Sequence, residues 1–219
     1  MRVAIFDFDG TLYANETFQL LMKHLKNHPL YSNRYKKFFR AILPLYIGYK
    51  LKVYPENMLK ERSMQFYLKV FKNFSTAELD IYFEELAEKM KKDFNPLVLS
   101  KLEQHSNEDI HIMLVSGAYT PLLHSVTKGL PFNTIIGTDI PIIGQTIDSQ
   151  VPILHIQGNR KNKKIFAALE GETIDWDNSF AYGDSFSDLS VLELVGNPVA
   201  VNPDTKLKKI AVERKWTII

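Results

Sequence analysis

Short apolar runs alternate with helical patterns over much of the chain. Five runs, each too short for an ordinary helix, predict buried strands at residues 3–8, 110–115, 134–136, 179–182 and 198–201. Helical spacing is found at residues 121–128, 163–169, 189–195 and 205–213, whereas residues 139–158 favour a hairpin excursion. Alternating strands and helices are typical of βαβ units. These regions therefore predict an α/β fold with a Rossmann-like, doubly wound, mostly parallel sheet.

Residues 16–95 have a helical pattern throughout. Apolar side chains recur at steps of three and four residues, most clearly over residues 82–90, and Ser75 with Glu78 predicts a capping box at the start of that helix. The prolines expected to divide the helices are Pro29, Pro44 and Pro55. We therefore predict two parts: a core formed by residues 1–14 and 96–219, and an inserted all-helical cap formed by residues 15–95.

The composition is that of a globular protein. Of the 219 residues, 45% are hydrophobic and 24% are charged, which excludes wholesale disorder. The absence of cysteine excludes disulfides, thiolate metal sites and cysteine nucleophiles. Acidic residues within the first ten positions do not suit a secretory signal, and the longest apolar run of the first half, near residues 41–48, is too short to span a bilayer. We expect a cytoplasmic protein.

The formal net charge of +2 hides an uneven distribution. Residues 16–95 carry 15 basic and 9 acidic side chains, a net of +6, while the other residues carry 12 basic and 16 acidic ones, a net of −4. The most basic stretch, residues 23–72, is also rich in aromatic residues. Three interpretations fit it: a solvated helix face, steering of anionic substrates, or docking on a membrane surface or nucleic acid. We expect no nucleic-acid partner, and peripheral contact with phospholipid stays open.

The strongest chemical signal is the segment FDFDGTL at residues 6–12. Side chains two positions apart in a strand share a face, so Asp7 and Asp9 can converge on one ligand beyond the carboxyl end of the first strand. Two carboxylates there suit a magnesium ion, or a nucleophile paired with a general acid and base. Aspartates that merely cap a loop are the alternative, but Asp-x-Asp-Gly-Thr after an apolar strand is a rare pattern.

Three further motifs lie where predicted strands end or helices begin. Ser116 and Gly117 place a hydroxyl and a turn before a helix, where they can bind phosphate or cap the turn. The basic segment 160–164 opens another helix, and because cations oppose the dipole there, it indicates either a bound phosphate or a solvated patch. Asp184 and Asp188 bring carboxylates to the same sheet edge, although Asp188 can also cap a helix.

In this order, the motifs resemble those of the haloacid dehalogenase superfamily of phosphohydrolases, in the subgroup similar to phosphoserine phosphatase. The resemblance covers the core from Val3 to Leu12 and from about Pro96 to the tail around Trp216, including NPVAVNP at residues 197–203. A helical insertion after the first strand also resembles the cap of that subgroup. The resemblance implies a magnesium-dependent phosphomonoester hydrolase acting on a small phosphorylated metabolite or a lipid head group.

The resemblance also implies catalytic roles. Asp7 would be the nucleophile that forms an aspartyl-phosphate, and Asp9 would protonate the leaving oxygen and then activate water. Magnesium would be held by the Asp7 carboxylate, the Asp9 backbone carbonyl and Asp184. Asp188 would not bind the ion itself but would support the residues that do. An acid at position 9 indicates phosphoryl transfer rather than dehalogenation.

Phosphate binding is implied for residues from two of the later motifs. Ser116, the Gly117 amide and Lys161 would bind the transferring phosphoryl oxygens. Lys161 fits the family spacing best, as Gly-x-x-Lys, but Lys163 and Lys164 lie close enough in the sequence to compete for this role.

In the cap, fewer residues match. Glu16 resembles the glutamate that binds the substrate amine in phosphoserine phosphatases, although an acid at a helix start is favoured by the dipole anyway. Arg62 is the candidate for the substrate carboxylate, and Lys52 lies near the expected spacing. Phosphoserine itself is therefore not the favoured substrate. His24 and His28 are spaced like helix metal ligands, but Pro29 follows and no third ligand is evident, so no zinc site is expected.

Two alternative functions use the same fold. A phosphotransferase or mutase would share the aspartyl-phosphate step, and the motifs do not distinguish water from an acceptor sugar. A non-catalytic phosphate-binding regulatory module is expected to lack Asp7 or Asp9, and both are present. The sequence gives neither the physiological substrate nor the oligomeric state.

Overall fold

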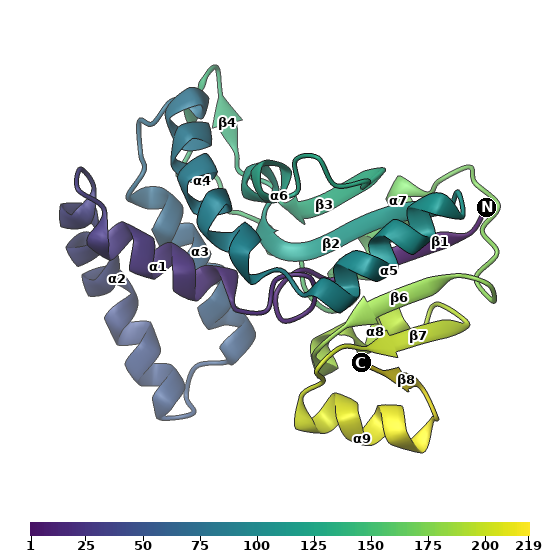
Figure 1. Cartoon of the computed structure of the whole chain (residues 1–219). Coiled ribbons are helices and arrows are strands. Elements are labelled where there is room, and N and C mark those ends of the chain that lie inside the picture. The colour runs from purple at the N-terminus through teal and green to yellow at the C-terminus, as the bar shows by residue number, and fades with distance from the viewer.

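The computed structural model describes all 219 residues, and its centre is one parallel sheet (Figure 1). The six strands lie in the order β3-β2-β1-β6-β7-β8, and every neighbouring pair is parallel. Their bounds are Val3–Phe6 (β1), His111–Tyr119 (β2), Thr134–Thr138 (β3), Phe180–Gly183 (β6), Asn197–Ala200 (β7) and Thr217–Ile218 (β8). The predicted doubly wound sheet is confirmed. The chain winds to opposite sides of β1, which places the ligand crevice at the carboxyl end of that strand.

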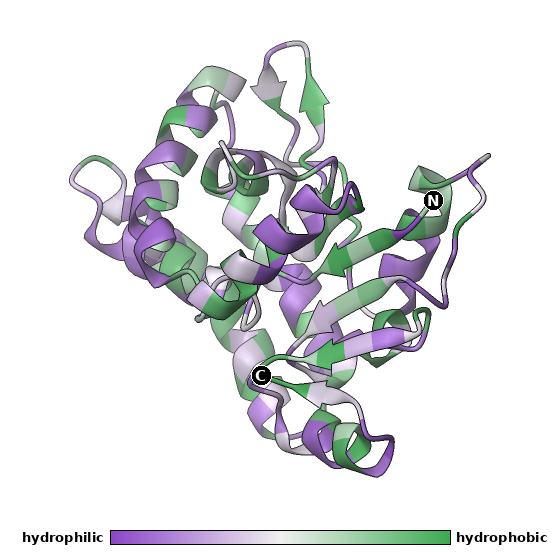
Figure 2. Ribbon diagram, turned by 45° about the vertical axis from the view of Figure 1, so that its right-hand side comes forward, coloured by the Kyte–Doolittle hydropathy of each residue, from purple (hydrophilic) through white to green (hydrophobic).

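Helices cover both faces of the sheet. On one face Ala4 and Phe6 of β1 pack with α5 (Pro96–Asn107) and α6 (Thr120–Val126). On the other face Val3 and Ile5 pack with α7 (Asn159–Ala168), α8 (Leu189–Leu192) and α9 (Thr205–Glu213). Successive residues of β1 thus face opposite helical layers, which is why this strand reads as a continuous apolar run. Figure 2 shows the hydrophobic residues concentrated along the strands, with hydrophilic turns on the outer sides of the helices.

Four helices follow β1 in the chain. They are α1 (Thr17–Asn27), α2 (Ser32–Lys50), α3 (Glu56–Lys69) and α4 (Thr76–Met90), and a short 3-10 turn, η1 (Lys91–Asp93), leads to α5. The predicted capping box is present: Ser75 accepts from the Glu78 amide, and the Glu78 carboxylate accepts from the Ser75 amide. Prediction was wrong at Pro44, which lies inside α2. Its missing N–H costs one helical hydrogen bond, and its exposed position leaves room for the ring.

The four helices share their apolar interior with the sheet. A single cluster of buried residues runs from Phe6 of β1 to Tyr67 and Phe83 of the helices. Tyr119, the last residue of β2, donates from its hydroxyl to the Met64 carbonyl of α3 over 2.8 Å. The division of the chain into core and cap domains therefore stays a prediction.

Three smaller elements complete the fold. Strands β4 (Ile142–Ile143) and β5 (Thr146–Ile147) pair antiparallel, as the hairpin prediction required. The hairpin contacts the helical part, because the Thr76 amide donates to the Gln145 carbonyl over 2.9 Å. Helix α5 and strand β8 were not predicted. Pro96, where the core is predicted to resume, is the first residue of α5, a position that tolerates proline because its N–H would be unpaired.

Candidate active site

The predicted site residues lie at the carboxyl edge of the sheet. Strand β1 ends at Phe6, two residues before its predicted end, so both aspartates of the first motif follow the strand. The Asp7 amide still donates to the Tyr182 carbonyl of β6 over 2.9 Å, which fixes Asp7 at the sheet edge. Its side chain is buried, beside residues from the ends of β6 and α7.

Among the three candidate lysines, only Lys161 lies in this group. From α7 its buried ammonium donates to Asp7 Oδ1 over 2.5 Å and to Asp188 Oδ1 over 2.6 Å. Lys163 is exposed, and Lys164 lies 3.6 Å from a carboxylate oxygen of Asp139. Burial acts to lower the pKa of Lys161, but Asp188 and Asp7 raise it further than burial lowers it, so this lysine stays charged.

Three carboxylates meet around that ammonium. Ligand oxygens of Asp7, Asp184 and Asp188 lie within 4.8 Å of one another. Two glycines make room for them. A Cβ at Gly10, whose φ is +74°, would lie 2.2 Å from Asp184 Oδ2, and a Cβ at Gly183 would lie 2.7 Å from the Cβ of Asp188. The glycine in the Asp-x-Asp-Gly-Thr motif therefore allows the backbone to pass directly beneath Asp184.

Asp188 stands at the N-cap position of α8, as the capping alternative predicted, but its side chain makes no cap hydrogen bond to that helix. It caps the preceding 3-10 turn η2 (Phe186–Asp188) instead, whose N-cap Ser185 donates from its amide and its hydroxyl to Asp188 Oδ2, over 3.3 Å and 2.9 Å. Asp188 is therefore the third residue of a capping box. One of its oxygens holds the turn and the other holds Lys161, so its carboxylate is fixed on both sides.

The donor set fits a divalent cation. Burial, followed by the charge of Asp188, raises the pKa of Asp7 well above its usual range, although Lys161 acts to lower it. Burial, again followed by Asp188, raises the pKa of Asp184 to about 7. In both cases burial is the larger cause and the neighbouring carboxylate the second, so each shift marks a buried carboxylate whose charged form a cation would favour. Carboxylate oxygens are the ligands that magnesium prefers, so Asp7 and Asp184 are suited to hold such an ion, with Asp188 beside them.

The side chain of Asp9 lies apart from this trio. Its carboxylate accepts from the Thr17 amide over 3.0 Å and from the Thr17 hydroxyl, at the first residue of α1. The Asp9 carboxylate is therefore not one of the three carboxylates that lie within 4.8 Å of one another, and its convergence with Asp7 on one ligand stays a prediction. Burial, with a contribution from Glu16, raises the pKa of Asp9 to about 7, while the bonds from Thr17 lower it.

Ser116 and Gly117 do not form the predicted turn. Strand β2 continues through both residues to Tyr119, with a register shift against β3 after Val115. The Ser116 hydroxyl is buried and accepts from the Ala118 amide over 3.1 Å. A Cβ at Gly117 would lie 2.5 Å from Nε2 of His155, a residue that the sequence did not single out. Close approach of this histidine thus requires glycine at 117.

The cap candidates separate into one near residue and two distant ones. Glu16 is exposed at the N-cap of α1, and it lies beside the site because the next residue, Thr17, donates to the Asp9 carboxylate. Its charge contributes to the raised pKa values of Asp9 and Asp184, although burial is the main cause of both. Arg62 and Lys52 are exposed and form no ion pair, and the structure does not bring them to the carboxylates. Periodicity could not have shown this, because it does not fix how the helices turn over the sheet.

A polar pocket adjoins the site between α3 and the start of α7. Its volume is about 390 Å³, and it is lined by Asn57, Met58, Glu61, Gln157, Gly158, Arg160 and Ser187. Glu61 of α3 and Arg160 of α7 form an ion pair across it. Met58 is its only apolar side chain, so the pocket suits a polar group better than an acyl chain.

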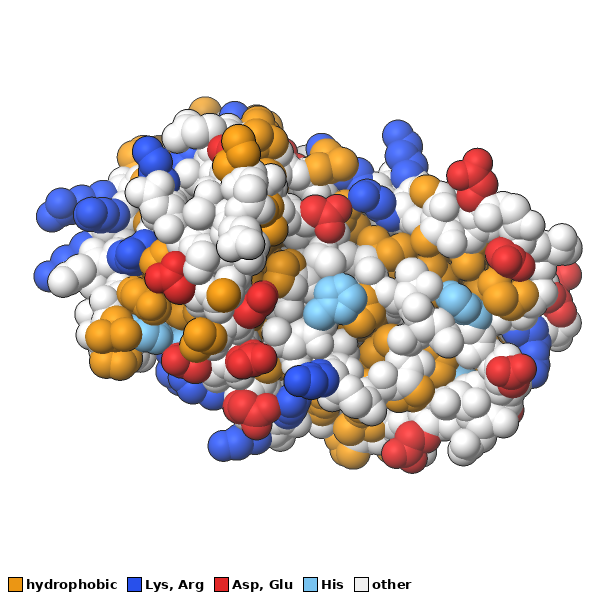
Figure 3. Space-filling model, turned by 90° about the horizontal axis from the view of Figure 1, so that it is seen from above, with side chains coloured by type: hydrophobic (Ala, Val, Ile, Leu, Met, Phe, Trp, Pro, Cys, Tyr) orange, Lys and Arg blue, Asp and Glu red, His pale blue; other side chains and the backbone are white.

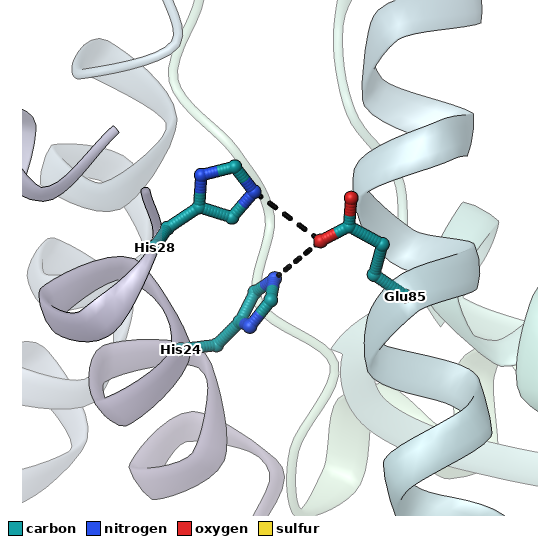
Figure 4. Close-up of side chains that lie close together, drawn as sticks. All are labelled: His24, His28 and Glu85. Atoms are coloured by element: carbon teal, nitrogen blue, oxygen red, sulfur yellow. Dashed lines mark hydrogen bonds and ion pairs between the residues drawn. The ribbon is translucent and has the colours of Figure 1, made fainter. Parts of the chain in front are cut away.

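The paired histidines have a third neighbour that the sequence did not reveal (Figure 4). Nε2 of His24 and Nε2 of His28 lie 3.3 Å and 3.2 Å from one carboxylate oxygen of Glu85 in α4. On the far sides of the rings, the Leu30 amide donates to Nδ1 of His28 and the Lys89 ammonium lies 2.9 Å from Nδ1 of His24. Donors at both Nδ1 atoms leave the protons on Nε2. In this arrangement the rings present N–H groups to Glu85 rather than lone pairs to a metal.

Comparison with curated proteins finds phosphatases. Over 232 aligned residues the chain is 26% identical to a histidinol-phosphatase of Neisseria meningitidis, covering 100% of this chain and 98% of the relative. Over 151 residues it is 28% identical to a phosphoserine phosphatase of Mycobacterium tuberculosis, covering 66% of this chain and 47% of the relative. The chain thus spans nearly all of one relative and about half of the other.

Solved structures share the fold. A protein of unknown function from Bordetella pertussis matches with a TM-score of 0.83 at 20% identity, covering 100% of this chain and 97% of that one. A substrate-bound phosphoserine phosphatase matches with a TM-score of 0.63 at 15% identity, covering 100% and 92%. The model of the haloacid dehalogenase-like hydrolases matches residues 4–193, which include every residue of the carboxylate and lysine group. The chain belongs to the haloacid dehalogenase-like hydrolase family.

Proposed function

We propose that this protein is a magnesium-dependent phosphomonoesterase that works through an aspartyl-phosphate on Asp7. The observation that carries the proposal is the pairing of two differently held aspartates. Asp7 is fixed by the Lys161 ammonium, while Asp9, two residues later, has a pKa of about 7 and is held by Thr17. One carboxylate is thereby suited to attack, and the other to carry a proton near neutral pH.

In the first step, an oxygen of Asp7 attacks phosphorus and the bond from phosphorus to the ester oxygen breaks. Asp9 gives its proton to that departing oxygen, so the alcohol leaves neutral. Lys161, the Gly117 amide and the Ser116 hydroxyl are the groups proposed to bind the other phosphoryl oxygens as negative charge spreads over them. Lys161 already spans Asp7 and Asp188, so it needs little movement to meet a phosphate bound at Asp7.

In the second step, Asp9 acts as a base. Its carboxylate takes a proton from water, whose oxygen attacks phosphorus, and the bond to Asp7 breaks to release phosphate. A bound magnesium ion would supply positive charge that lets anionic phosphate approach an anionic carboxylate. Asp7, Asp184 and the backbone carbonyl of Asp9 are proposed to hold it, with Asp188 in support.

We propose a small, amine-bearing phosphomonoester as the substrate class. The relative that matches over its full length is named for histidinol phosphate and the partial one for phosphoserine. Two features of this chain agree with that chemistry. Glu16 stands exposed beside Asp9 and can meet an ammonium group, and the adjoining pocket is polar. The exposed position of Arg62 does not support a role with the substrate carboxylate.

The test is phosphate release from histidinol phosphate, phosphoserine, a sugar phosphate and glycerol phosphate, each with magnesium and with excess chelator. We expect turnover with magnesium only, fastest for an amine-bearing ester, and none for Asp7→Asn. A rise in melting temperature of the wild type on adding magnesium, absent in Asp184→Asn, would report the ion independently of turnover. Full activity of Asp7→Asn would refute the mechanism, whereas transfer to an added alcohol instead of water would indicate a phosphotransferase.

A further inference from the structure

The outer face of α2 exposes large apolar side chains. Of the 19 residues in this helix, only Phe38 and Ile42 are buried. The exposed apolar residues of the helix are Phe39, Leu43, Tyr46 and Ile47, and Leu51 and Val53 follow directly after its end; we call these six the α2 outer face. The first four stand at positions i, i+4, i+7 and i+8, so they lie on one face of the helix and form one stripe. Ile47 is 50% exposed, Leu51 69% and Val53 78%, and an unpartnered stripe of this kind indicates an interaction site.

Within residues 32–55, the charged side chains on and around this stripe are all basic. Between residues 32 and 55 there are six basic residues and no acidic residue. Arg34 is engaged internally, since it donates to the Val70 carbonyl and lies over the Phe74 ring. The other five are Lys36, Lys37, Arg40, Lys50 and Lys52, and all are exposed. None of the ion pairs in the structure includes any of them.

The face is also freely accessible. In Figure 1, α2 lies at the end of the molecule away from β6–β8, and Figure 3 shows basic side chains projecting from that same end. None of the carboxylates or the lysine of the catalytic group comes from α2. Binding at this face is therefore separable from catalysis.

We propose that the α2 outer face docks this protein on an anionic lipid surface. Lying in the plane of the interface, the helix would place Leu43, Ile47 and Leu51 at the acyl boundary and its cations among the head groups. Aromatic residues favour that depth, and Phe39 and Tyr46 are spaced to reach it. No helix of the protein is long and apolar enough to cross a bilayer, so the contact is peripheral.

The charge and the apolar side chains of this face favour an anionic membrane over a second copy of the chain or a nucleic acid. A second copy bound through the same face would bring five unpaired cations against five more, which opposes a symmetric dimer. Nucleic acid would satisfy the cations but would leave the aliphatic side chains Leu43, Ile47 and Leu51 in water. An anionic membrane meets both kinds of side chain at once.

The test is cosedimentation of the full chain with vesicles. Phosphatidylcholine vesicles are compared with vesicles of equal parts phosphatidylcholine and phosphatidylglycerol, at low and high salt. We expect binding only to the anionic vesicles, weakened by salt. Each basic residue near such a surface raises the affinity for the membrane about fivefold. The triple variant Lys36→Gln, Lys37→Gln, Arg40→Gln should therefore bind about a hundredfold more weakly than the wild type. Leu43→Gln with Ile47→Gln should lose about tenfold or more.

Matched controls come from exposed residues elsewhere. Ile81→Gln with Val212→Gln removes two exposed apolar side chains, and Lys163→Gln, Lys208→Gln, Lys209→Gln removes three exposed charges. Both should bind like the wild type, and all variants should keep the wild-type melting temperature. The proposal fails if the wild type does not bind anionic vesicles at low salt, or if the α2 variants bind as tightly as the controls. A dimer in analytical ultracentrifugation, or a nucleic-acid complex, that the α2 variants abolish without any vesicle binding also overturns it.

Discussion

Lys161 holds the carboxylate of Asp7 at 2.5 Å, although 154 positions separate the two residues. The same ammonium holds Asp188 at 2.6 Å, and all three side chains are buried. Before substrate arrives, therefore, the proposed nucleophile is already oriented by the group proposed to bind the phosphate. The buried cation between these two carboxylates also stabilises the fold, because removing it leaves two buried charges without a partner.

Replacing this lysine should impair both activity and folding. For Lys161→Met we expect kcat/KM for phosphate release to fall about 10²–10³-fold, as when one donor to a developing charge is lost. The free energy of unfolding, from urea titration without magnesium, should fall by about 3 kcal/mol, because Asp7 and Asp188 stay buried and unpaired. Lys163→Met is the control, since that side chain is exposed, and it should change neither quantity appreciably. Equal loss in both variants would contradict the assignment.

A methyl group at position 10 should disturb the metal site. In Gly10→Ala the new Cβ would lie 2.2 Å from Asp184 Oδ2, so that carboxylate must move. We expect a higher magnesium concentration for half-maximal activity and a lower maximal rate. Gly129→Ala separates this effect from backbone strain, because Gly129 has a φ of +90° with no atom within 4 Å of the added Cβ. Backbone strain should cost each variant about 1–2 kcal/mol of stability, but only the first should change the magnesium requirement.

Thr17 should lower the pKa of Asp9, the proposed general acid. Its buried hydroxyl and its amide both donate to Asp9 Oδ1, and these bonds lower the pKa of Asp9 against the effect of burial. Thr17→Val removes the hydroxyl, so the pKa should rise and kcat should fall by about tenfold as the carboxylate loses its orientation. Thr17→Ser keeps the hydroxyl and should restore most of the rate. In the valine variant, the decline of the rate at alkaline pH should shift to higher pH. In the serine variant it should stay where it is in the wild type.

Acid should destabilise the fold partly through His24. Burial, then the charges of Lys89 and His28, lower its pKa from 6.5 to about 4. The unfolded chain therefore binds more protons than the native one between these values. The contribution of His24 to stability is complete above pH 6.5, falls as the pH drops towards 4, and is level below that. Asp9 and Asp184, whose pKa values are raised to about 7, act with the opposite sign over the same range, so the loss through His24 is measured as a difference between two proteins unfolded in urea at pH 7.5, 5.5 and 4.5. Each such histidine contributes a slope of up to about 1.4 kcal/mol per pH unit.

Lys89→Met is the matched variant for that measurement. Without the neighbouring ammonium the pKa of His24 should lie closer to 6.5, so the loss between pH 6.5 and 4 should be smaller than in the wild type. An unchanged slope would show that Lys89 has no electrostatic effect on the ring. His155, whose pKa is also lowered to about 4, mainly by burial, contributes equally to the slope in both proteins, as do His105 and His111, whose pKa values burial also lowers.

Much of this molecule followed from the chain alone, because its strands and catalytic motifs are local signals. An apolar run buried on both faces predicts a parallel strand, and β1, β6 and β7 were all found within two residues of their predicted ends. Asp7, Asp184 and Asp188 could be assigned to one edge of the sheet because parallel strands bring their carboxyl ends together.

Other features required the tertiary structure. Family spacing favoured Lys161 but left Lys163 and Lys164 as competitors, since only the packed angle of α7 decides which side chain reaches Asp7. Likewise, Glu85 belongs to a helix almost 60 residues beyond His28, so no local pattern could show that it meets both histidines. The sequence determined the elements and the motifs through local spacing. The tertiary structure decided which long-range pairs form, because burial and charge pairing depend on how the helices are oriented on the sheet.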